Sequence, residues 1–214
     1  ENNYWKQYYL CMAGVRYSAR HKSNYVTVSQ DGLEAACYGQ YPFFIVKLCG
    51  LVPKSGRLII RFQAKRDTGD DAYVPGYTAI AVVNTQMYKG APVTWWNEVK
   101  SKISPVNSSP KDTEILMEMA DNGCHSTLDQ GSTETPWPNQ RCAVELDLNN
   151  TSVDSDPVIP DGKGRLAFTD PDTDNELCTF NSFYNGADDF SIVCTLGMRT
   201  TLTIESASYL LEPR

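Results

Sequence analysis

The sequence predicts an all-β protein, an eight-stranded antiparallel jelly-roll sandwich with long loops. Alternation of apolar and polar residues dominates several segments, and clusters of Gly, Pro, Asp and Asn separate these segments. Helical spacing is scarce in comparison. About eight short strands joined by long connections are typical of a jelly roll.

The clearest strand runs from Arg57 to Lys65 and follows turn residues that end in Gly56. Every second residue is apolar, which is the pattern of a half-buried strand. The side chains expected on its outer face are Arg57, Arg61, Gln63 and Lys65. The core residues expected from this and later strands are Leu58, Ile60, Phe62, Val144, Leu146 and Ile192.

Further strands are expected in segments that are rich in apolar and β-branched residues. They are residues 24–29, 41–48, 77–84, 141–149, 165–169, 190–194 and 200–205. Trp96, Val99 and Ile103 have helical spacing, and Ile115 to Met119 could form a turn or two of helix. We expect a single domain, with an N-terminal arm (1–23), a core (24–205) and a C-terminal tail (206–214).

The charge balance argues against a dedicated nucleic-acid surface, because the net charge is −7. No segment approaches the ~20 apolar residues that cross a bilayer, so no membrane insertion is expected. The chain begins Glu1-Asn2-Asn3 rather than with Met and carries no signal-peptide pattern there. A mature product cut from a precursor, or a fragment, fits this start.

The seven cysteines are widely spaced and include no C-x-x-C pair, so they predict no zinc site. Most lie in apolar strand patterns, where a reduced cysteine behaves as a small hydrophobe. Mostly free thiols and a reducing compartment are therefore expected. The sequons at Asn107 and Asn149 favour the opposite, a secreted protein.

Candidate catalytic groups are few. His125 and Asp129 would share one face of a strand about 13 Å apart, too far for a hydrogen-bonded dyad. Asp170, Asp172 and Asp174 resemble the start of a calcium loop but lack its Gly and distal Glu, which favours solvated turn residues. We expect no enzyme activity, no metal and no cofactor.

The stretch from Gly123 to Gln140 predicts a strand followed by a rigid corner. Pro136 cannot donate to a β ladder and ends the strand, while Pro138 restricts Trp137 to an extended conformation. A fixed corner that carries a tryptophan suits either the core or a subunit contact.

The order of these features resembles the capsid proteins of picorna-like positive-strand RNA viruses, over roughly residues 40 to 197. Gly56 to Phe62 is similar to one strand of that family, and Tyr77 to Asn84 is similar to the next. The residues that carry the rest of the resemblance are Gly123, His125, Asp129, Gly131, Pro136, Trp137, Gly186, Asp189 and Phe190. The chain length also suits a plant virus with three small coat proteins.

The resemblance implies a structural protein that assembles with sister jelly-roll subunits into an icosahedral shell around the RNA genome, in the host cytoplasm. The isolated subunit would bind RNA only weakly, given its negative charge. A host receptor or vector would remain to be found. The N-terminal aromatic residues are expected to pack under a neighbouring subunit on the shell interior; they are Tyr4, Trp5, Tyr8 and Tyr9. At least one ring of the pair Trp95 and Trp96 is expected in a core or an interface.

Two alternatives remain open. A secreted jelly-roll polysaccharide lyase or glycosidase would need acid–base residues on one sheet face, and the outer face of residues 57–65 could line such a site for acidic polysaccharides. A non-enzymatic carbohydrate-binding or receptor module is the other. The aromatic pairs Tyr8-Tyr9 and Trp95-Trp96 could stack on sugars if exposed, but they do not discriminate between the alternatives. Paired cysteines under non-reducing conditions would favour either secreted alternative.

Overall fold

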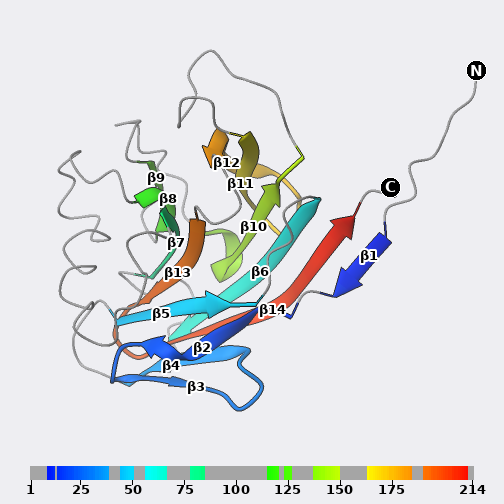
Figure 1. Ribbon diagram of the computed structural model, residues 1–214. Helices are drawn as coiled ribbons and strands as arrows, with labels where there is room; N and C mark the ends of the chain where they lie inside the picture. The colour runs from blue at the N-terminus through cyan, green and yellow to red at the C-terminus, as the bar shows by residue number, and fades with distance from the viewer. Residues whose placement is uncertain are drawn as a thin grey trace, which may run out of the picture.

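Two antiparallel β-sheets make up the part of the chain that the computed structural model describes (Figure 1). The described residues are 9–12, 14–38, 44–50, 56–66, 78–84, 115–120, 123–126, 137–149, 163–184 and 190–211. Apart from one short 3-10 turn, η3 (Pro138–Gln140), every regular element among them is a strand. The all-β sandwich expected from the alternating sequence pattern is confirmed.

The larger sheet is built around its longest strands, β6 and β14. Its strand order is β12 (Glu176–Tyr184), β11 (Lys163–Thr169), β10 (Arg141–Asp147), β6 (Arg57–Arg66), β14 (Thr200–Leu211), β4 (Glu34–Cys37) and β3 (Val26–Val28). A further strand, β1 (Tyr9–Met12), pairs with the end of β14. Figure 1 shows β1 lying beside the C-terminal half of that strand.

The smaller sheet brings the N-terminal region together with residues from the middle and end of the chain. Its order is β2 (Arg16–Lys22), β5 (Phe44–Cys49), β13 (Phe190–Leu196), β7 (Ala79–Asn84), β8 (Ile115–Ala120) and β9 (Gly123–Ser126). All of its strand pairs are antiparallel.

The core consists of side chains from both sheets. Strand β6 alternates buried and half-buried positions along most of its length, as its sequence predicts. The six expected core residues are all buried: Leu58, Ile60, Phe62, Val144, Leu146 and Ile192. At roughly 25 cal/mol per Å² of apolar surface, this shared core is the main source of the sandwich's stability.

The strand number exceeds the eight expected, because the described residues form fourteen strands. The helical turn expected at Ile115–Met119 is wrong: these residues belong to β8, which pairs with β7 and β9. The apolar residues Ile115, Met117 and Met119 fit a two-residue period as well as a helical one, and pairing with neighbouring strands decides between them.

The sheets also extend beyond the expected core boundaries of 24 and 205. Strands β1 and β2 lie within the expected arm, and residues 206–211 belong to β14 rather than to a free tail. Tyr9 is paired with Leu211, so the backbone groups of β1 find their hydrogen-bond partners on β14 of the same chain.

Candidate binding face on the larger sheet

The outward side of the larger sheet carries charged residues that are joined in pairs. Arg57 on β6 donates from Nη2 to Oε1 of Glu145 on β10 at 2.9 Å. Arg165 on β11 donates to Glu176 and Thr179 on β12. The hydroxyl of Thr179 and then the Arg165 guanidinium lower the pKa of Glu176 below its usual value.

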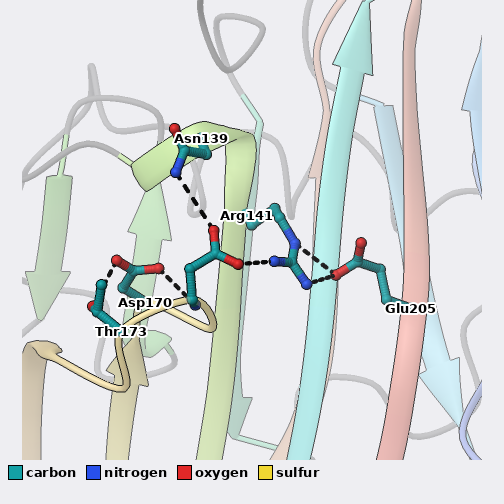
Figure 2. A network of polar contacts seen from close by, with 6 residues as sticks. Asn139, Arg141, Asp170, Thr173 and Glu205 are labelled. Atoms are coloured by element: carbon teal, nitrogen blue, oxygen red, sulfur yellow. Dashed lines mark hydrogen bonds and ion pairs between the residues drawn. The ribbon is translucent and has the colours of Figure 1, made fainter.

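Arg141 is the centre of a polar network on this face (Figure 2). Its Nε and Nη2 donate to Oε2 of Glu205 at 2.9 and 2.6 Å, and its Nη1 donates to Asp172. Asn139 Nδ2 also donates to Asp172, at 3.4 Å. The bond to Glu205 raises the pKa of Arg141, so this guanidinium stays charged. The network joins β10, β14 and the turn after β11.

The aspartates of the turn between β11 and β12 are engaged in protein contacts. Asp170 accepts from the backbone N–H of Asp172 at 2.9 Å and from the hydroxyl of Thr173 at 2.8 Å. Asp174 adopts a left-handed conformation with φ 57°, which aspartate tolerates. These contacts agree with the turn interpretation. No group of three or more metal-binding side chains occurs in the described parts of the chain.

At the C-terminal end of β6 the basic residues do not form ion pairs with carboxylates. Lys65 and Arg66 are both exposed, and Arg66 pairs in register with Thr200 at the start of β14. Arg199 immediately precedes Thr200 and is exposed as well. Within the described ranges no ion pair joins any of these three cations to a carboxylate.

Two tyrosines lie near these cations. Tyr25 directly precedes β3 and Tyr38 directly follows β4, and Val26 pairs with Cys37, so the two rings flank the same end of one ladder. They are the exposed large hydrophobic residues among those described, with 67% and 65% of their surfaces accessible.

The sheet register places the tyrosines and the cations at one end of the sheet. Thr201 pairs with Ala36 on one side and with Lys65 on the other. Tyr38 is two residues beyond Ala36, and Arg199 is two residues before Thr201, so antiparallel pairing brings them to the same edge. We call Tyr25, Tyr38, Lys65, Arg66 and Arg199 the cation–tyrosine end. Glu34, also exposed, lies farther along β4, opposite Thr203.

Three residues singled out from the sequence have structural roles. Gly56 has φ 91°, a conformation that favours glycine, and its N–H donates to Oδ1 of Asn149 at 3.0 Å. Phe62 is fully buried. Trp137 is 3% exposed and packs in the core, so of the two roles expected for the corner, core packing holds in this chain. Asn139 and Gln140, with φ 49° and 61°, turn the chain into β10.

The other sequence candidates are placed only in part. His125 lies in β9 opposite Glu118, Phe190 begins β13 opposite Asn84, and Tyr9 lies in β1. Tyr9 was expected under a neighbouring subunit, whereas its backbone pairs within its own chain. The candidates outside the described residues are Tyr4, Trp5, Tyr8, Trp95, Trp96, Asp129, Pro136 and Asp189.

Most of the described cysteines are free thiols, as expected. They are Cys37, Cys49, Cys142 and Cys194, of which only Cys49 is exposed. Cys178, in contrast, is disulfide-bonded. Burial raises the pKa of the Cys142 and Cys194 thiols, and burial followed by the nearby Cys194 raises the pKa of Tyr17. These groups are therefore neutral at physiological pH.

Sequence reasoning identified the outward set of β6 but missed the cation–tyrosine end as a site. The alternation shows that Lys65 points outward, and the structure confirms it. Nothing in the local sequence distinguishes Tyr25 and Tyr38 from core tyrosines such as Tyr17, which is 2% exposed.

No helix long and apolar enough to span a bilayer occurs in the described segments.

The fold and this face together define an antiparallel β-sandwich with an exposed polar sheet. No family model and no curated protein matches the chain. Among solved structures, the chain is similar to the PSpry domain of TRIM65, with a TM-score of 0.55 and 11% identity, over 89% of this chain and 90% of that one. At this identity the likeness is one of fold.

Two further solved structures also match over nearly their whole length. Arcelin-5, a lectin-like defense protein from Phaseolus vulgaris, has a TM-score of 0.49 and 10% identity, over 97% of this chain and 99% of its own. The Lotus tetragonolobus seed lectin has a TM-score of 0.49 and 12% identity, over 97% of this chain and 100% of its own.

Proposed function

We propose that this chain is a non-enzymatic binding domain that recognises carbohydrate through the cation–tyrosine end. The observation that carries the proposal is the exposure of Tyr25 and Tyr38 side by side at the end of the β3–β4 ladder. Tyrosine combines a flat apolar ring with a polar hydroxyl, so it is common in binding surfaces where one end stays wet.

The surroundings of the two rings suit a sugar. A sugar presents an apolar C–H face that stacks on an aromatic ring, and hydroxyl groups that need hydrogen-bond partners at its edge. Thr27 and Thr201 lie near the rings on the outward register of β3 and β14. Each of the two tyrosines directly adjoins a paired strand, which limits the ordering cost of binding.

Binding to a panel of immobilised neutral and acidic glycans tests this function. We expect the unmodified chain to bind at least one class, and Tyr25→Ala and Tyr38→Ala each to weaken binding about tenfold, or ~1.4 kcal/mol. The phenylalanine variants keep the ring and should retain most of the affinity, which makes them the matched controls. Binding that survives removal of both rings would show that the ligand site lies elsewhere.

Assembly into a viral shell is a second candidate function. With it we propose that eight central strands of the sandwich form a jelly roll. The observation that favours it is the strand order. Neighbours β4, β14, β6 and β10 in one sheet face β5, β13, β7 and β8 in the other. The chain passes from sheet to sheet at β4–β5–β6–β7 and again at β13–β14, a path typical of jelly rolls.

The remaining strands lie outside these eight, and one of them, β1, pairs with β14 of the same chain.

Solution mass measured together with electron microscopy of the native source material tests the assembly. Closed particles built with sister subunits would support it. A chain that stays monomeric in its native source, with no particles, would exclude it.

A further inference from the structure

We infer that the cation–tyrosine end selects an acidic polysaccharide, whose carboxylate groups are bound by Lys65, Arg66 and Arg199 while a sugar ring stacks on Tyr25 or Tyr38. The inference rests on the proposed carbohydrate-binding function and adds the chemical class of the ligand.

The first argument is the concentration of unneutralised positive charge. Arg66 is opposite Thr200 and Lys65 is opposite Thr201, so all three cations lie within neighbouring positions of two adjacent strands, which are about 4.8 Å apart. Of the described cations elsewhere on this sheet face, Arg57, Arg141 and Arg165 are held by carboxylates, whereas Arg61 makes no ion pair within the described ranges. Among the described residues of this sheet, cations without an ion pair are therefore concentrated at this end. Lys65 lies on the outward register, and Arg66 lies on the opposite register at the exposed last position of β6.

The second argument is the backbone of Arg199. Its φ of 54° lies in the left-handed region. Glycine adopts this conformation without strain, whereas a residue with a bulky side chain pays a conformational free energy on the order of 1 kcal/mol. The residue sits in the turn from β13 to β14, beside Gly197 and Met198. A large charged residue in a turn position that suits glycine indicates that its exposed side chain has a binding role.

The third argument separates an acidic polysaccharide from a duplex nucleic acid. Duplex DNA carries one charge per ~1.7 Å of its axis, and its binding requires many phosphate contacts. The present chain has a net charge of −7 and three clustered cations at this end, so a dense polyanion would be repelled beyond the patch. A uronate chain spaces its charges by whole sugar rings, which matches a small cationic site.

The test compares one sugar backbone with and without its charge. The probes are polygalacturonate and the same polymer after full methyl esterification, with poly(U) as the nucleic-acid probe. Affinities are measured by calorimetry at low and moderate salt. We expect the charged polymer to bind at least tenfold more tightly than the ester, and the difference to shrink as salt rises.

One variant tests the cations and a second serves as its control. Lys65→Gln combined with Arg66→Gln and Arg199→Gln should remove the preference and leave weak binding of the ester intact. Arg57→Gln changes an outward cation eight positions away on the same strand, about 26 Å, and should keep it. Circular dichroism verifies that both variants fold.

The outcomes are distinguishable. Equal affinity of the unmodified chain for the two polymers overturns the acidic-ligand inference and leaves the carbohydrate function standing. Tighter binding of poly(U) than of polygalacturonate also overturns the inference, in favour of a nucleic-acid ligand. Failure to bind any member of the glycan panel overturns the proposed function itself and the inference with it.

Discussion

The guanidinium of Arg141 on β10 spans β6 and reaches the carboxylate of Glu205 on β14, with Nη2 and Oε2 2.6 Å apart. Figure 2 shows that the same side chain also contacts the turn after β11. A single arginine on β10 therefore links β14 and the turn after β11 across the outer face. Both partners are about one quarter exposed, so solvent weakens the pair but does not abolish it.

We expect a double-mutant cycle of Arg141→Gln and Glu205→Gln to give a coupling free energy of ~0.5–1 kcal/mol in unfolding experiments. The arginine variant should cost more than the glutamate variant, because it also loses Asp172. The pair Arg57 and Glu145, whose arginine is more exposed and makes a single contact in the described part of the chain, supplies the comparison and should couple less. A coupling near zero for Arg141 and Glu205 would show that the network contributes geometry but no stability.

Gly50 and Gly14 offer a matched pair of glycine substitutions. Gly50 has φ 127°, and an added Cβ would lie 2.8 Å from the backbone oxygen of Gly14. Gly14 has open space at its own Cβ position. We expect Gly50→Ala to lower the free energy of unfolding by ~1–3 kcal/mol, and Gly14→Ala to stay within ~0.5 kcal/mol of the unmodified chain. Urea denaturation of both variants provides the measurement.

Trp137 is a core residue, so its removal should act on stability. Trp137→Ala leaves a cavity, and we expect a loss of ~3–5 kcal/mol in the free energy of unfolding. Size-exclusion chromatography with light scattering would separate this effect from an interface role. A variant with unchanged stability and altered oligomeric mass would contradict the assignment of Trp137 to the core.

The cysteines should differ in reactivity according to burial. Cys49 is exposed, whereas Cys142 and Cys194 are buried and have raised pKa values. The thiolate is the reactive species, so we expect an alkylating reagent to label Cys49 in the native protein and the other two only after denaturation. Mass spectrometry of digested protein reads the sites. Native labelling of Cys142 as fast as that of Cys49 would contradict this burial.

Alkaline pH should destabilise the fold through its buried tyrosines. Burial raises the pKa of Tyr209 from an ordinary 10.0 to about 12. The unfolded chain then loses this proton at lower pH than the folded chain, so the stabilisation is complete below pH 10.0 and is lost as pH rises toward 12. We expect Tyr209→Phe to reduce the slope of unfolding free energy against pH in that window. An unchanged slope would mean that Tyr209 ionises freely in the folded state.

The sequence by itself determined the class of fold and much of the core. Two-residue alternation in segments such as 57–65 and 141–149 sets which side chains face inward, because successive strand residues point to opposite faces. Gly56 and the Pro138 corner were also readable, since both follow from backbone restrictions on single residues. The resemblance to capsid proteins, by contrast, stays an expectation.

Only the tertiary structure decided the remaining strands and the candidate site. Short strands such as β1, β4 and β8 form because partners distant in sequence satisfy their hydrogen bonds, as Tyr9 and Leu211 do. Tyr17 and Tyr25 are both tyrosines near strand ends, yet one lies in the core and the other in solvent. That difference, and the meeting of Tyr38 with Lys65 and Arg199 at one sheet end, depends on long-range strand register, which no local pattern encodes.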